Sequence, residues 1–155
     1  KMWKTILKME AKMAEKSKIQ LIKEFIETCP LLKNGKVNVD YIKDKPQSYS
    51  IDETPAETIL NRFRDGGVRK QILFDFSIQA NFSVLENIKN SKFCDDFTEW
   101  IELQDIKGNL PKIDGIDWIK CTGRGTILQT TETTAIYVIP MQVAYIQEAY
   151  IQEAY

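Results

Sequence analysis

The chain has 155 residues, of which 43% are hydrophobic and 28% charged, and this composition excludes an intrinsically disordered chain. Its 21 basic and 22 acidic residues leave a net charge of −1, so no overall attraction to nucleic acid or to an anionic membrane is expected. Histidine is absent, which removes the commonest general base, the commonest zinc ligand and every Ser-His-Asp or Cys-His arrangement.

Residues 1–16 carry a lysine at every fourth position, a spacing that places these side chains on one face of a helix: Lys4, Lys8, Lys12 and Lys16. A basic amphipathic helix can bind a membrane surface or an acidic partner. Four like charges on one stripe repel one another, however, and this favours a frayed extension. The sequence predicts neither a membrane-spanning segment nor a signal peptide, so we expect the protein to stay in the cytosol where it is made.

The first clear helix begins at Ser17, which has the spacing of a capping box with Gln20. Apolar residues recur behind it at helical spacing as far as Ile26. Proline disfavours helix in the residue before it, so Pro30 ends the segment. The pattern therefore predicts a helix over 18–28.

The chain then turns towards β structure. The Asn34-Gly35 dipeptide predicts a tight turn, and apolar residues alternating with polar ones predict a strand over 36–42. Residues 43–50 are mostly polar and predict a loop, with a short strand beginning near Tyr49 and Ile51.

Residues 54–64 allow two interpretations. Residues 54–57 have the proline and capping-box spacing of a helix start, but the alternation that follows favours a strand over 58–64. Asp65-Gly66-Gly67 predicts a hairpin. The alternating run over 71–79 is the strongest strand pattern in the chain, and a strand after such a turn needs an antiparallel partner.

Two helices are predicted next. Ser83 and Glu86 have capping-box spacing, and a short helix is predicted to be interrupted near Asn90-Ser91. A second helix over 92–106 presents aromatic and acidic residues on opposite sides, and Gly108 suits its C-terminal cap.

The last third predicts strands: one over 116–120, and a hairpin with arms over 127–130 and 134–145. In the second arm five apolar side chains share one face: Tyr137, Ile139, Met141, Val143 and Tyr145. Pro140 points the other way and predicts an edge strand or a bulge. The pentapeptide 144–148 recurs at 149–153, and we expect no functional role for residues 149–155.

Few residues are candidates for chemistry. The densest carboxylate group could hold a divalent ion if its members converged: Asp95, Asp96, Glu99 and Glu102. The solvated face of an amphipathic helix accounts for the same residues and is the favoured interpretation. The three cysteines are expected to be reduced, buried or half-buried thiols: Cys29, Cys94 and Cys121. We therefore expect no catalytic residue, cofactor or metal site.

One compact basic cluster flanks the Asp65-Gly66-Gly67 turn and is a candidate interface: Arg62, Arg64, Arg69 and Lys70. It could meet an acidic protein surface or nucleic acid, although no aromatic platform of the kind that binds single strands lies beside it. Arg124, in the loop over 123–125, and Pro140, on its predicted edge strand, are the other interface candidates.

Five stretches, in this order and spacing, carry a resemblance to a known family: residues 29–41, 49–55, 65–76, 97–104 and 107–111. They resemble the tail-terminator or tail-completion proteins, often labelled minor capsid proteins, of Firmicutes phages and phage-tail-like bacteriocins. The resemblance covers residues 18–146, and residues 1–16 and the C-terminal repeat lie outside it. A single domain over 17–148 is expected between these two ends.

The resemblance implies an α+β fold in two layers, a mainly antiparallel sheet with two principal helices packed on it, in addition to the N-terminal helical extension. It implies a structural virion protein without catalytic residues. Copies would form a ring, six-fold in related terminators, at the head-proximal end of the tail tube. The ring would stop tube polymerisation and meet the head–tail connector and, in contractile tails, the last sheath ring.

Three alternatives remain open from the sequence. The first is a head-completion or neck connector protein on the capsid side of the same junction. The second is a metal-dependent hydrolase, which predicts that the carboxylates of 92–106 converge in a pocket. The third is a host adaptor that binds DNA, without sequence specificity, through the basic cluster between Arg62 and Lys70.

Overall fold

The computed structural model describes residues 2–4, 6, 7, 16–33, 35–40, 42 and 47–149. Residues 2–4 and 6–7 are helical. Lys8, Lys12 and the repeat residues 150–155 lie outside the described residues. No helix in the described ranges is long and apolar enough to cross a membrane.

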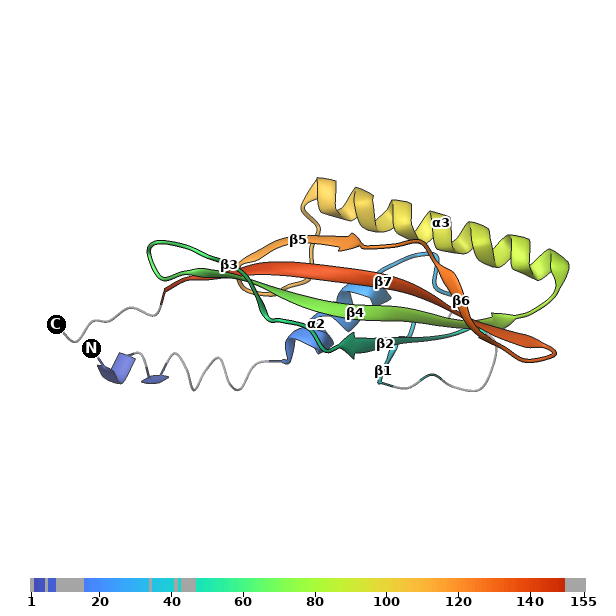
Figure 1. Cartoon of the computed structure of the whole chain (residues 1–155), viewed down its shortest axis with the longest axis horizontal. Coiled ribbons are helices and arrows are strands. Elements are labelled where there is room, and N and C mark those ends of the chain that lie inside the picture. The colour runs from blue at the N-terminus through green and yellow to red at the C-terminus, as the bar shows by residue number, and fades with distance from the viewer. Residues whose placement is uncertain are drawn as a thin grey trace.

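Two long strands form the centre of the sheet. β4 (Val68–Asn81) and β7 (Thr134–Gln147) have 14 residues each and pair antiparallel over their full length. At 3.4 Å per residue the pair extends for about 45 Å. Figure 1 shows it running along most of the molecule.

Each long strand is flanked by two shorter strands placed end to end. β2 (Ser48–Thr54) and β3 (Ile59–Arg62) both pair with β4, while β5 (Ile116–Cys121) and β6 (Thr126–Thr130) both pair with β7. All these pairs are antiparallel, and only β1 (Asn38–Val39) adds a parallel strand, beside β2. The predicted α+β fold with a mainly antiparallel sheet is therefore confirmed.

The two halves of the sheet repeat one design. A helix is followed by a flanking strand, a break, a second flanking strand, a hairpin and then a long strand. α2 (Lys18–Glu27) begins the first half, where β1 comes between it and β2, and α3 (Val84–Lys107) begins the second. Because the long strands are antiparallel, β3, which pairs with β4, and β6, which pairs with β7, lie at opposite ends of the sheet, as Figure 1 shows.

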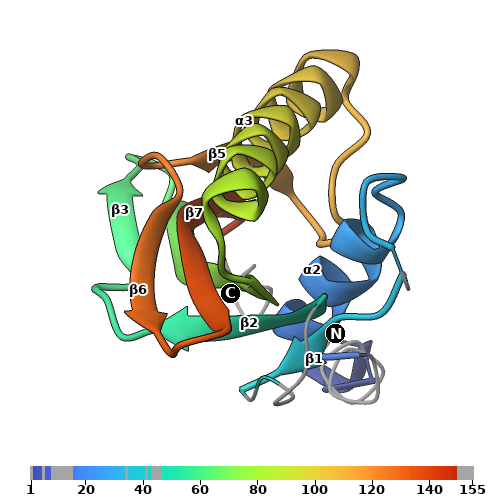
Figure 2. The same ribbon diagram turned by 90° about the vertical axis from the view of Figure 1, so that its right-hand side faces the viewer.

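Both helices cover the same face of the sheet (Figure 2). Phe76 of β4 stacks on Phe97 of α3 with ring centroids 4.5 Å apart, and Tyr49 of β2 stacks on Phe76 at 5.9 Å. The helices meet each other where Phe25 lies 5.3 Å from Trp100. Each such fully buried aromatic side chain contributes about 1.5–3 kcal/mol from burial. The five predicted β7 side chains, from Tyr137 to Tyr145, are all buried in this core.

α3 is one continuous helix, so the predicted interruption at Asn90-Ser91 is wrong. Asparagine weakens helices when its amide competes for nearby backbone groups. Here Asn90 is buried, and its side-chain amide donates to the carbonyl of Asn81 on β4, 2.9 Å away. Because the Asn90 amide is hydrogen-bonded to β4, it does not compete for the backbone groups of α3, and the helix continues through this residue. The predicted caps are confirmed: Ser83 accepts from the Glu86 amide, and Gly108 is left-handed with φ 75°.

The other elements near the N-terminus are partly as predicted. The helix over 18–28 is confirmed as α2, with Ser17 accepting from the amide of Gln20. The predicted strand over 36–42 is reduced to β1. The short strand predicted near Tyr49 and Ile51 is confirmed as β2, which begins at Ser48, inside the predicted loop over 43–50. Residues 55–57 are not helical, and β3 confirms the strand predicted over 58–64.

Pro140 does not lie on an edge strand, since β7 has neighbours on both sides. Its carbonyl accepts from the Thr122 amide, 2.8 Å away. The nitrogen and carbonyl of one residue in an antiparallel strand point to the same side. The missing N–H therefore faces the break at 122–125 between β5 and β6, and no ladder bond to β4 is lost. A central strand tolerates this proline because its neighbour is interrupted there.

Candidate functional site

The predicted basic cluster lies on the hairpin formed by β3, its turn and the start of β4, residues 59–70, which we call the basic hairpin. It contains four basic residues and one acidic residue. The turn is held by hydrogen bonds from the Phe63 amide to the Gly67 carbonyl and from the Gly67 amide to the Asp65 carboxylate. Gly66 has φ 92°, which a side chain would strain. The hairpin is therefore a defined structure and not an open loop.

The structure divides the four basic residues between different roles. Arg62 and Arg64 are exposed. Arg69 is engaged, because its Nε lies 2.9 Å from Oδ2 of Asp117 on β5 and its Nη1 donates to Asn61. Lys70 is half-buried opposite Tyr145. Arg62 and Arg64 are therefore the two guanidinium groups of the hairpin that are exposed.

The opposite corner of the sheet was not recognised from the sequence. All five residues of β6 are exposed, including Ile127 at 46% and Leu128 at 71%. The register of β6 against β7 shifts between Ile127 and Gln129, so Leu128 is the extra residue of a β-bulge. Two consecutive large apolar residues in a short strand indicate that at least one of them is exposed. The reason is that neighbouring side chains of a strand point to opposite faces, and only one face can pack against a single core.

β3 has the same irregularity. Its register against β4 shifts between Ile59 and Asn61, which makes Leu60 the extra residue. Leu60 and Phe63 are each 37% exposed. Bulges on edge strands redirect a side chain and interrupt the ladder that another chain could join. At both corners, therefore, apolar side chains are exposed and the backbone edge of the strand is interrupted by a bulge.

Arg124 is not part of the basic hairpin. It lies in the break between β5 and β6, is highly exposed, and has Nη2 3.5 Å from Oδ1 of Asp95 on α3. The break itself is tightly packed, since a Cβ on Gly125 would come within 2.7 Å of Sγ of Cys94. Arg124 therefore contributes to the flank formed by β5, β6 and α3.

α3 has an acidic outer side. Six acidic and three basic residues occur in Val84–Lys107. Asp95, Glu99 and Glu102 are exposed, and Asp96 pairs with Lys92 at 2.8 Å. No three histidine, cysteine or carboxylate side chains in the described ranges are grouped so that they could hold a metal ion. The geometry of these carboxylates is that of a charged helix surface.

The three thiols are free, as predicted; Cys29 and Cys94 are buried and Cys121 is half-buried. Burial raises the pKa of Cys94 and of Cys121 to about 11, and burial also raises the pKa of Cys29. These thiols are therefore protonated near neutral pH, and protonated thiols are weak nucleophiles.

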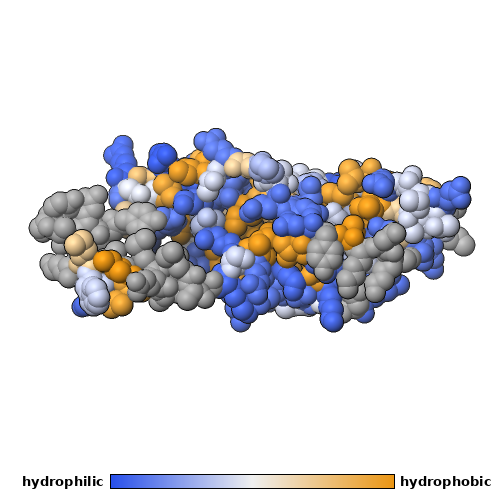
Figure 3. Space-filling model, turned by 90° about the horizontal axis from the view of Figure 1, so that it is seen from below, coloured by the Kyte–Doolittle hydropathy of each residue, from blue (hydrophilic) through white to orange (hydrophobic). Residues whose placement is uncertain are grey.

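The face of the sheet away from the helices carries one unusual pair. Asp52 of β2 lies directly opposite Asp75 of β4, an arrangement in which like charges repel. Burial, and to a lesser extent the Asp52 carboxylate, raises the pKa of Asp75. Apolar patches alternate with hydrophilic side chains on the surface that Figure 3 shows.

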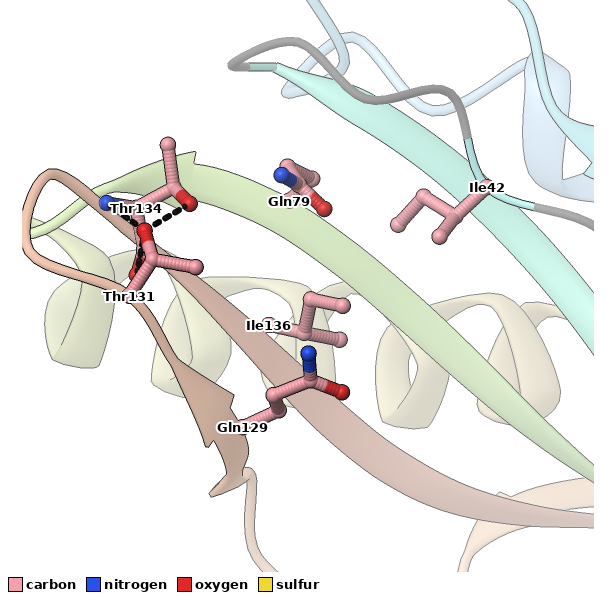
Figure 4. Close-up of a pocket in the computed structure, with 6 residues that line it drawn as sticks. All are labelled: Ile42, Gln79, Gln129, Thr131, Thr134 and Ile136. Atoms are coloured by element: carbon pink, nitrogen blue, oxygen red, sulfur yellow. Dashed lines mark hydrogen bonds between the residues drawn. The ribbon is translucent and has the colours of Figure 1, made fainter.

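The described residues line two shallow hollows on the surface. One of about 200 Å³ is lined by isoleucines, hydroxyls and amides: Ile42, Gln79, Gln129, Thr131, Thr134 and Ile136. Figure 4 shows the Thr131 and Thr134 hydroxyls hydrogen-bonded to each other at its rim. None of these six side chains ionises near neutral pH. The second hollow, of about 150 Å³, lies beside the first turns of α3 and includes Lys33, Lys89 and Tyr137.

The candidate functional surface thus consists of two different corners, the basic hairpin and the flank around β6. They lie at opposite ends of one sheet and have different charge. In comparison with known proteins, no family model matches this chain and no curated protein shows significant similarity to it.

Proposed function

We propose that this protein is a structural phage protein that assembles into a ring, expected to be a hexamer, at the head-proximal end of the tail tube. The ring stops tube polymerisation and provides the surface that joins the head. This proposal begins from the resemblance of residues 18–146 to tail terminators. It assigns the protein a role through surface contacts and no enzymatic step.

The observation that carries the proposal is the diagonal placement of two unlike corners. A closed ring needs heterologous contacts, in which one patch of each copy meets a different patch of the next copy. The basic hairpin and β6 lie on opposite flanks and at opposite ends of the sheet. Each is exposed, carries apolar side chains and is built on a long central strand, which are features suited to a repeated lateral contact.

A terminator also needs two unlike faces, one that matches the end of the tube and one that does not continue it. The sheet has this asymmetry, since both helices cover one face and the other carries short polar side chains and the Asp52–Asp75 pair. This asymmetry of the two faces supports the proposal.

The test combines particle mass in solution with negative-stain images, with and without purified tail tubes. Discrete rings, or rings capping the tube ends, are expected. A chain that remains monomeric and leaves tube ends bare would overturn the proposal. Rings that bind isolated connector and not tubes would favour a head-completion protein instead.

A further inference from the structure

We propose that the lateral contact between copies is made by the basic hairpin of one copy docking on the β6 flank of the next. We define the β6 flank as β6 with the acidic residues around it: Asp95, Glu102 and Glu132. The inference rests on the proposed function for its biological meaning, but the contact can be tested without a tail tube.

The acidic residues of the β6 flank lie beside the segments that precede and follow its apolar strand. Asp95 contacts Arg124, just before β6, and Glu132 lies in the exposed turn just after it. Glu102 lies close enough to Cys121, at the end of β5, to raise the pKa of its thiol, behind the larger effect of burial. The flank therefore combines the exposed side chains of Ile127 and Leu128 with three nearby carboxylates and the guanidinium of Arg124.

The basic hairpin is complementary to this surface in both charge and apolar character. Arg62 and Arg64 are exposed beside Leu60 and Phe63. Opposite charges at the rim of a contact guide encounter and fix register, while buried apolar side chains supply affinity. The partner that this hairpin fits is thus a second copy of the chain.

Charge also selects the orientation. Two β6 flanks facing each other would bring Asp95, Glu102 and Glu132 against their own counterparts, and two basic hairpins would bring arginine against arginine. Like charges facing one another disfavour both symmetric contacts. The hairpin-to-flank contact brings Arg62 and Arg64 of one copy against the carboxylates of the next, and that contact is heterologous, so it generates a ring when the rotation closes.

The contact is made through side chains and not by extending the sheet. Leu60 and Leu128 are the extra residues of bulges in their strands, and bulges obstruct a continuous backbone ladder between chains. Both side chains are accessible to a partner, Leu60 at 37% and Leu128 at 71% exposure. Mutating these side chains is therefore expected to disrupt association while leaving the subunit folded.

The test uses two charge-reversed variants, Arg62→Glu with Arg64→Glu, and Asp95→Lys with Glu132→Lys. Each variant alone places like charges across the contact and should sediment as a monomer. In an equal mixture every hairpin meets a flank of opposite charge, so assemblies of alternating variants should return. Lys33→Glu with Lys112→Glu is the matched control outside both surfaces, and it should associate like the wild type.

Site-specific cross-linking checks the geometry. With a short bifunctional thiol reagent at pH 7, Leu60→Cys and Leu128→Cys should form dimers when mixed and not when separate. The raised pKa values of Cys94 and Cys121, both about 11, keep background reaction low. Dimers from Leu128→Cys alone would indicate a symmetric contact and overturn the inference.

The outcomes separate this inference from the proposed function. Wild-type rings that neither charge-reversed variant disturbs would overturn the hairpin-to-flank contact while leaving the ring intact. Rescue by mixing, combined with failure to cap tubes, would support the contact and overturn the terminator role. A wild-type chain that remains monomeric at its highest soluble concentration would overturn the inference. So would hairpin variants that associate like the wild type and lose only DNA binding, measured on the same samples.

Discussion

The two corners of the sheet share a backbone design and differ in chemistry. Each has a short bulged strand, a tight hairpin and a strand of 14 residues. At the β3 corner Arg62 and Arg64 are exposed together with one carboxylate, Asp65, whereas three exposed carboxylates and Arg124 lie near the β6 corner. The same backbone arrangement thus occurs at both corners, and the side chains on it give the two corners surfaces of different charge. A subunit that joins its own copies head to tail needs such a difference.

The largest expected effect is on association. Leu128→Asp places a charge at the centre of the proposed contact, and Leu60→Asp does so on the other side. Each should weaken self-association more than tenfold, since every 1.4 kcal/mol lost is tenfold in affinity, with little change in melting temperature because both side chains are exposed. Analytical ultracentrifugation measures the effect. Ile106→Asp, an exposed position on α3, is the control, and an equal loss there would mean that the corners are not special.

The breaks between the flanking strands should respond very differently to added volume. Gly125 packs against Cys94, where a Cβ would lie within 2.7 Å of the sulfur, whereas Ala56, in the break between β2 and β3, is exposed. Gly125→Ala should therefore lower the free energy of unfolding by about 1–3 kcal/mol, the usual cost of overpacking. Ala56→Val should change it by less than about 0.5 kcal/mol. Urea denaturation of both variants measures these changes in the free energy of unfolding. Equal changes would show that the break between β5 and β6 is not tightly packed.

The caps of the two leading helices offer a closer comparison. Ser17 and Ser83 each accept a hydrogen bond from the amide three residues later. Replacing either by alanine should cost about 1 kcal/mol. The loss is expected to be similar in the two halves, although α3 is 24 residues long and α2 has 10, because a cap acts on the first turn alone. Thermal unfolding of Ser17→Ala and Ser83→Ala measures this, and no loss in either would contradict the cap geometry.

The smallest effect concerns pH. Because the pKa of Asp75 is raised in the folded chain, folding disfavours its ionised form. The contribution of Asp75 to the free energy of unfolding is therefore most favourable at pH values below the pKa that its carboxyl has in the unfolded chain. It is lost as the pH rises through the higher pKa of the folded chain. Asp75→Asn should thus raise the melting temperature slightly at pH 7, and the gain should shrink below about pH 4, near the ordinary pKa of aspartate. Lys112→Gln is the exposed control, and a gain independent of pH would refute the electrostatic cause.

Much of the fold was predictable because local signals agreed with the tertiary result. The Ser17 and Ser83 caps, the Gly108 cap, the hairpin at Asp65-Gly66-Gly67 and the alternation of β7 all appear as the sequence indicates. These features are short-range, since hydrogen-bonding and backbone preferences operate over three or four residues. The basic cluster was also found, as charge is visible in the sequence.

The remaining features depended on long-range pairing. Asn90 is compatible with a helix because Asn81 of a distant strand receives its amide, and Pro140 lies in a central strand because the neighbouring strand breaks beside it. Arg69 is engaged by Asp117, 48 residues away. The consecutive apolar residues Ile127 and Leu128 signal an exposed side chain, but only the register shift against β7 identifies Leu128 as the extra residue of a bulge.

The sequence by itself therefore determined which segments form helices and strands, where most of them begin and end, and where positive charge gathers. Only the tertiary structure decided which strands lie in the centre, which arginines remain available and how the two corners are placed relative to each other. The physical reason is that secondary structure reflects local backbone and side-chain preferences, whereas surfaces are defined by which distant groups cover one another.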